Sequence, residues 1–208
     1  MVNIADNVYH CGYHSEKSYG AASYFIQRAA GNVLVDSPRF TPALVKRLEE
    51  MGGIKYMFLT HVDDVADHQK FHDHFGASRI IHRKELCEAI PVAEIVLEHD
   101  FHSKIDDAAD ELVMIHTPGH TAGHTVLNYK RKFLFSGDHI AYSQELNQLV
   151  SWKGYSDSWD KQIESVEKLI EYYWEWLLPG HGRRIKAHPE AFKIHVEKCV
   201  FWMKEQSV

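Results

Sequence analysis

Four short segments decide the fold expected for this chain: THVDDVADH at 60–68, TPGHTAGH at 117–124, SGDH at 136–139 and PGHG at 179–182. Each of them follows an apolar run of the kind that forms a buried strand. The glycines before His120, Asp138 and His181 permit sharp turns and a close approach of the backbone. The pattern therefore predicts histidine and aspartate side chains on loops at a sheet edge, where chemistry is usually found.

The rest of the chain alternates between strand-like and helix-like segments. Strands are expected at 22–27, 32–36, 56–60, 79–82, 111–116, 125–129 and 133–136. Helices are expected from Thr41-Pro42 to Gly52, shortly before Gly76, over 158–173 and from Pro189 onward. Two groups of strands interleaved with helices indicate a layered, mixed α/β domain.

Composition narrows the class of protein. With 208 residues, 45% of them apolar, the chain is long enough for one domain with a substantial core. The formal charge of −6 gives no basic footprint for nucleic acid, and no apolar run is long enough for a membrane helix. The N-terminus lacks a signal-peptide pattern, and three distant cysteines indicate reduced thiols. We therefore expect a cytoplasmic protein that binds neither nucleic acid nor membrane.

The residues that end these runs suit a divalent cation. His61, His120, Asp138 and His181 supply imidazole and carboxylate groups, which are the usual protein ligands of zinc, iron and manganese. No G-x-S-x-G elbow for a serine nucleophile occurs, and no phosphate-binding G-x-x-x-x-G-K-[ST] loop occurs. The motifs therefore favour metal chemistry over nucleophilic serine chemistry.

In this order, the four segments resemble the metallo-β-lactamase superfamily over about residues 20–185. The resemblance implies an αββα four-layer sandwich, formed by residues 1–208 as a single domain. It also implies a site for two divalent metal ions at one edge of the sandwich. Zinc is the expected metal, with iron or manganese as alternatives.

The first loop departs from the pattern of that family, which normally reads H-x-H-x-D-H. Here Asp63 stands where the second histidine is expected, and Asp64 is a rival for the same role. The resemblance implies one metal held by His61, His120 and Asp63, and another held by Asp67, His68 and His181. Asp138 would bridge the two ions, and Asp67 would also be the catalytic residue that orients the nucleophile. A carboxylate in place of imidazole favours iron or manganese somewhat over zinc.

Several neighbouring residues have two open interpretations. Asp36, His124 and His139 are candidates for supporting the ligands from behind. Capping of the Ser37-Pro38 turn is the favoured alternative for Asp36, and ordinary packing explains the two histidines at least as well. Four aromatic residues lie between positions 142 and 159: Tyr142, Trp152, Tyr155 and Trp159. They form either a wall over the substrate or part of the core.

These observations lead to one main hypothesis and two alternatives. The main hypothesis is an enzyme, a hydrolase that uses a metal-bound hydroxide on a small ester, thioester, lactone or phosphoester. One alternative is an iron-dependent oxidoreductase resembling the persulfide dioxygenases, and the other is a non-catalytic binding protein with the same fold. The expected partner is a small-molecule substrate, and the oligomeric state is left open.

Overall fold

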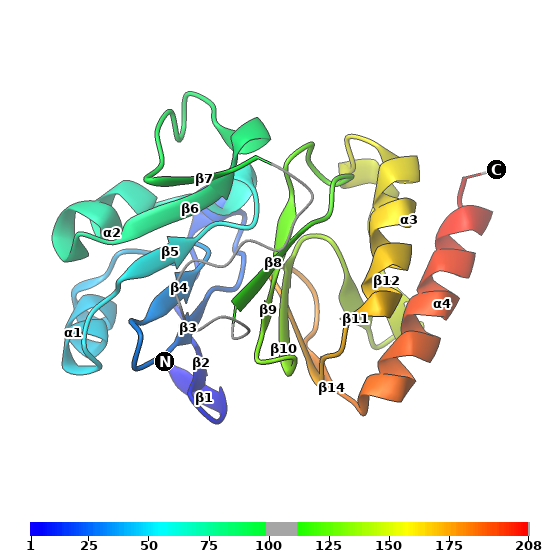
Figure 1. The fold of residues 1–208 in the computed structure, drawn as a ribbon, viewed down its shortest axis with the longest axis horizontal. Coiled ribbons are helices and arrows are strands. Elements are labelled where there is room, and N and C mark those ends of the chain that lie inside the picture. Colours follow the sequence, from blue (N-terminus) through cyan, green and yellow to red (C-terminus); the bar gives the residue numbers. More distant parts are fainter. Residues whose placement is uncertain (99–111, 208) are drawn as a thin grey trace. The chain divides into compact units, whose positions relative to one another are not determined.

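The computed structural model describes residues 1–98 and 112–207. The chain divides into two compact units, Met1–Glu98 and His99–Val208, which we call the first and second units. Each unit contains one main sheet with two α-helices beside it (Figure 1). The expectation that residues 1–208 form a single domain stays a prediction.

The first unit is built on a seven-stranded sheet whose strands follow chain order. Its strands are β1 (Val2–Ala5), β2 (Val8–His10), β3 (Tyr24–Ile26), β4 (Val33–Val35), β5 (Tyr56–Phe58), β6 (Ser78–His82) and β7 (Ile95–Leu97). β1 to β4 pair antiparallel, whereas β4 to β7 pair parallel. Parallel neighbours need crossover connections; α1 (Pro42–Glu50) lies in the one between β4 and β5, and α2 (His68–Phe75) in the one between β5 and β6. Short 3-10 turns complete the unit: η1 (Glu16–Ser18), η2 (Val62–Asp64) and η3 (Arg83–Glu85).

One core cluster holds α1 and α2 against the sheet. Leu44 and Leu48 of α1 and Phe71 of α2 pack with Leu34 of β4 and Met57 of β5. Both helices lie on the same side of the sheet (Figure 1). Burying side chains of this size stabilises the fold by roughly 1.5–3 kcal/mol each, so this cluster fixes the helices that flank the predicted first loop.

The second unit contains a five-stranded sheet with the order β14-β13-β10-β9-β8 and a separate hairpin of β11 and β12. Its strands are β8 (Leu112–His116), β9 (Thr125–Tyr129), β10 (Phe133–Gly137), β11 (Ala141–Ser143), β12 (Gln148–Val150), β13 (Trp176–Pro179) and β14 (Ile185–Lys186). β10 and β13 are parallel, so the loops that follow them leave the same edge of the sheet. The helical elements are η4 (Lys153–Tyr155), α3 (Trp159–Lys168), η5 (Leu169–Glu171) and α4 (Pro189–Glu205).

The second core cluster joins α3 and α4 to this sheet. Ile163 and Val166 of α3 and Val196 of α4 pack with Leu134 of β10. The indole N–H of Trp159 also donates to the Met203 carbonyl at 3.1 Å, which ties the start of α3 to the end of α4. Among the described residues, no helix has the length and apolar character needed to cross a membrane.

A partly buried ion pair in the first unit predicts how stability depends on pH. Arg79 of β6 contacts both carboxylate oxygens of Glu94, with Nη2–Oε1 at 2.7 Å and Nε–Oε2 at 3.0 Å. These bonds lower the pKa of Glu94 from its usual 4.5 to about 2. The stabilisation is therefore fully present above pH 4.5 and is lost as the pH falls towards 2.

We expect Glu94→Gln to lower the melting temperature at pH 7 and to differ progressively less from the parent as the pH falls below 4.5. Thermal unfolding followed by circular dichroism from pH 7 to pH 3 measures this. Glu88→Gln is the matched control, because Glu88 is exposed. A constant difference between Glu94→Gln and the parent across that range would contradict the prediction.

Candidate metal centre

His61 follows β5 and is fully buried at the start of η2. Its Nδ1 lies 2.9 Å from Thr60 Oγ1, and Thr60 donates from both its N–H and its hydroxyl to Asp36 Oδ1. A hydroxyl carries one hydrogen and an ionised carboxylate only accepts, so Thr60 must accept from His61. The proton of His61 is therefore on Nδ1, and Nε2 presents a lone pair of the kind that binds a metal.

The two aspartates that compete for one role in this loop differ in environment. Asp63 Oδ2 lies 3.8 Å from His61 Nε2, and its side chain is 45% exposed. Asp64 is fully buried. Two atoms bound to one ion at about 2.1 Å can be no more than about 4.2 Å apart, so Asp63 and His61 fit a shared ion.

Asp67 stands immediately before α2 and has a contact at each carboxylate oxygen. Oδ2 accepts the Phe40 N–H at 2.9 Å, and Oδ1 pairs with Lys70 Nζ at 2.9 Å. Burial raises the pKa of Asp67, but these bonds outweigh it and hold the pKa below its usual value. Asp67 is therefore ionised at neutral pH, and it still has lone pairs with which to bind a metal or orient a water.

His68 has both ring nitrogens in local contacts. Nε2 lies 3.1 Å from the Ala89 carbonyl, and Nδ1 lies 3.3 Å from Arg79 Nη1. Because each ring nitrogen has one site, a metal on His68 would have to displace one of these partners. A cation would also be repelled by the adjacent guanidinium. The ligand role predicted for His68 stays a prediction, and it requires this arrangement to change.

In the second unit, the structure brings His120, Asp138 and His181 together. His120 Nε2 lies 3.9 Å from Asp138 Oδ2, and His181 Nδ1 lies 2.8 Å from both Asp138 oxygens. Both separations are below the limit of about 4.2 Å for two ligands of one ion. The donor set of two imidazoles and one carboxylate fits a divalent transition metal.

Hydrogen bonds from the start of α3 hold the loop that carries His120. The N–H groups of Ser158 and Asp157 donate to the carbonyls of Gly119 and His120, at 2.9 and 3.0 Å. Gln162, which is fully buried on α3, donates to the His139 carbonyl at 3.0 Å. Gln162 was not among the residues predicted from the sequence, although a glutamine among the apolar positions of a helix is a signal that could have identified it.

His124 and His139 lie beside this cluster and are fully buried. Their rings stack with centroids 5.5 Å apart, and His124 Nδ1 lies 3.0 Å from Thr117 Oγ1. Burial lowers the pKa of His139 to about 3, so this ring is neutral at physiological pH. A neutral, packed ring at this position adds no charge that would repel a cation at the neighbouring residue Asp138.

The comparisons with known proteins agree on one family. A sequence model of the metallo-beta-lactamase superfamily matches residues 19–181. The Drosophila melanogaster protein named Beta-lactamase-like protein 2 homolog is 24% identical over 192 residues, which are 80% of this chain and 60% of that protein. The chain therefore spans about 60% of the length of this relative.

Solved structures with low sequence identity share the fold. The crystal structure of VMB-1 has a TM-score of 0.74 at 16% identity and covers 99% of this chain and 96% of its own. The structure of TTHA1623 in a di-iron-bound form has a TM-score of 0.61 at 17% identity and covers 80% of this chain and 90% of its own. The chain belongs to the metallo-β-lactamase superfamily and has the mixed α/β fold of that family.

Proposed function

We propose that the chain is a metal-dependent hydrolase acting on a small ester, thioester, lactone or phosphoester. The observation that carries this proposal is the approach of the His120 and His181 imidazoles to the Asp138 carboxylate, at 3.9 and 2.8 Å. Three motifs far apart in sequence supply these groups, and each motif occupies the place that the family resemblance gives it.

We propose that His61 and a carboxylate of the same loop also bind metal. The Nδ1–H tautomer of His61 supports a ligand role for this residue, since it leaves a lone pair on Nε2. Asp63 and Asp64 are the candidate carboxylates: Asp63 Oδ2 lies 3.8 Å from His61 Nε2, within the separation that two ligands of one ion allow, and Asp64 is fully buried in the same loop. Two divalent ions are expected, with zinc as the first candidate and iron or manganese as alternatives.

When bound, divalent ions would lower the pKa of a water to about 7 and so supply a hydroxide nucleophile at neutral pH. Asp138 would hold the ions in place, because its two oxygens face His120 and His181. Asp67 would orient the attacking water rather than take its proton, since a carboxylate with a lowered pKa is a weak base.

Net charge and cysteine chemistry indicate the class of partner and the compartment. We propose a small-molecule substrate and no nucleic acid, because the net charge of −6 offers no general attraction to phosphate backbones. The free thiols of Cys11, Cys87 and Cys199 support a reducing compartment such as the cytoplasm.

A second candidate function is an iron-dependent oxidation of a persulfide on the same fold. The specific observation that favours it is the carboxylate pair Asp63 and Asp64 in the first loop, where the family pattern has a histidine. Carboxylates favour iron and manganese relative to zinc. TTHA1623, a structural neighbour, is described in a di-iron-bound form.

The deciding experiment combines metal analysis with a substrate panel. Protein freed of metal and reloaded with zinc, iron or manganese is assayed against a thioester, a lactone and a phosphodiester, and for oxygen uptake with a persulfide. Hydrolysis of one class, with one or two ions bound per chain, is the expected result. Oxygen uptake by the iron form alone would select the second function, and a protein that binds none of these ions would exclude both.

Replacement of Thr60 tests the proposed control of His61. Thr60→Val removes the hydroxyl between Asp36 and His61 while keeping the side-chain shape, so the Nδ1–H tautomer loses its acceptor. We expect metal affinity to fall by about 10–100-fold, the usual cost of losing a group that orients a ligand. Imidazole ¹⁵N shifts of His61 report the tautomer directly. Thr60→Ser restores the hydroxyl and should restore both readouts, and unchanged shifts in Thr60→Val would refute the role.

A further inference from the structure

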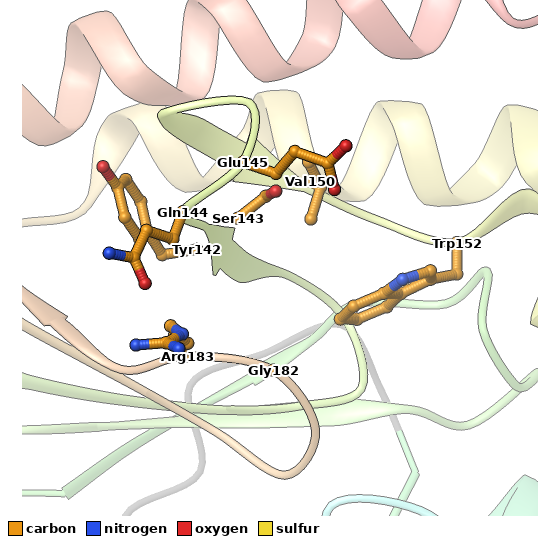
Figure 2. Close-up of a pocket in the computed structure, with 8 residues that line it drawn as sticks. All are labelled: Tyr142, Ser143, Gln144, Glu145, Val150, Trp152, Gly182 and Arg183. Carbon is orange, nitrogen blue, oxygen red and sulfur yellow. The ribbon is translucent and has the colours of Figure 1, made fainter.

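A pocket in the second unit lies outside the metal ligands. It has a volume of about 550 Å³ and is lined by the β11–β12 hairpin and by the loop before β14 (Figure 2). Two of its lining residues, Gly182 and Arg183, directly follow the candidate ligand His181. Because consecutive Cα atoms are about 3.8 Å apart, the Cα of Arg183 lies within about 7.6 Å of that of His181.

Arg183 supplies positive charge to this pocket. Its backbone is fixed, because its carbonyl accepts the Tyr142 N–H at 3.1 Å in a bridge with β11. Within residues 1–98 and 112–207, its exposed guanidinium makes no hydrogen bond or ion pair, and none joins it to Glu145 in the same pocket. The charge is therefore held at the pocket without a protein partner to neutralise it.

The other walls offer apolar surface. Tyr142, Val150 and Trp152 line the pocket, and Figure 2 shows the Trp152 indole at the end opposite Arg183. Gly182 allows the loop before β14 to approach Ala141 and Trp152 closely, because a Cβ at this position would lie 2.6 Å from Ala141 Cβ and 3.2 Å from Trp152 Cη2. Its φ of +87° also favours glycine. The pocket thus combines the Arg183 guanidinium with an aromatic face across the same cavity, and Glu145 on the hairpin is its other charged lining residue.

We propose that this pocket binds an oxyanion, a carboxylate or a phosphate, attached to an apolar or aromatic group. A guanidinium presents a planar fork of donors that matches both oxyanions, and the indole accepts the apolar part. As an anchor for the substrate, the pocket rests on the proposed hydrolase function. The binding of the oxyanion itself does not depend on that function.

The test uses three aromatic probes of similar size: phenylphosphonate, benzoate and benzylamine. Each is titrated into the full chain while the indole ¹H–¹⁵N signal of Trp152 is followed, with the signal assigned from Trp152→Phe. Arg183→Met removes the proposed receptor. Arg184→Met is the matched control, because Arg184 is the next residue, is exposed and does not line the pocket.

We expect at least one of the two anions to shift the Trp152 signal and to bind about tenfold more weakly to Arg183→Met than to Arg184→Met, since bonds to charged groups are the stronger ones. Arg183→Lys should fall between them, because lysine keeps the charge and loses the fork. The tighter anion identifies the natural oxyanion. Equal affinities in the two Met variants, or tighter binding of benzylamine than of either anion, would overturn the proposal.

A further arm separates this inference from the proposed function. In Asp138→Asn, which is expected to lose metal, an anion-induced shift of Trp152 that still depends on Arg183 places the oxyanion in the pocket and not on the ions. Failure of the hydrolase proposal would appear as absent turnover in the parent chain. Failure of the pocket proposal would appear as an unaffected Trp152 signal, so the two results are distinguishable.

Discussion

Asp138→Asn should lose at least one metal ion per chain and reduce turnover by about a hundredfold or more, because loss of even a group behind a ligand costs about 10–100-fold. The carboxylate of Asp138 faces His120 at 3.9 Å and His181 at 2.8 Å, so it is the shared element of the second-unit cluster. Asparagine has nearly the same shape but lacks the negative charge that offsets a bound cation. Metal content by mass spectrometry and steady-state kinetics measure both effects.

Two features make this substitution informative. The His181 N–H donates to Asp138 Oδ1 at 3.1 Å, and the amide oxygen introduced by Asp138→Asn can still accept it, so the loop should stay folded. Asp157→Asn makes the same chemical change at an exposed position close to the His120 loop. It should leave metal content and rate unchanged. Full metal occupancy together with parental turnover in Asp138→Asn would rule out the proposed metal centre.

Gly119→Ala is expected to have the largest effect on stability, lowering the free energy of unfolding by about 3 kcal/mol or more. Gly119 has a φ of +148°, and a Cβ there would lie 2.3 Å from Gln162 Cα and 2.5 Å from Gln162 N. These are backbone atoms of α3, so no side chain can move aside. With a total stability of about 5–15 kcal/mol for a typical protein, the variant should unfold at low denaturant concentration or fail to accumulate.

Gly76→Ala provides the comparison that isolates the clash. Gly76 ends α2 with a φ of +66°, but a Cβ there would meet nothing within 4 Å. This variant should lose only about 1–2 kcal/mol, the cost of a left-handed backbone for a residue with a side chain. Urea unfolding of both variants gives the two values. Equal losses would show that the contact between Gly119 and α3 is unimportant.

Local patterns explain why much of the fold could be predicted. The expected strand at 125–129 coincides with β9, and the expected strand at 32–36 contains β4. Helix α1 begins where Thr41-Pro42 predicts, with the Thr41 hydroxyl accepting the Leu44 N–H at 3.3 Å. Apolar periodicity and capping act between near neighbours, so sequence alone shows them. Strands β1, β2 and β14 were not predicted, because they lack the continuous buried apolar run that marks three-residue strands such as β4, and their pairing partners define them.

The aromatic segment after Asp138 shows how tertiary structure separates similar residues. Trp159 is buried in the core between α3 and α4, whereas Tyr155 is 75% exposed. Tyr142 and Trp152 line the pocket that also contains Arg183. Composition marks all four as aromatic, and only the packing of the β11–β12 hairpin and α3 assigns them to core, surface or pocket.

The sequence by itself determined the family, because each of the four motifs is a short continuous stretch and they appear in a diagnostic order. It also determined most strands and helices, whose signals are local. Only the tertiary structure showed that Asp36 acts on His61 through Thr60. It also showed that Arg79 and the Ala89 carbonyl contact the two ring nitrogens of His68, and that Gln162 donates to the His139 carbonyl beside Asp138. Hydrogen bonds between residues 11 to 24 positions apart depend on how distant segments pack, and no short-range pattern records that.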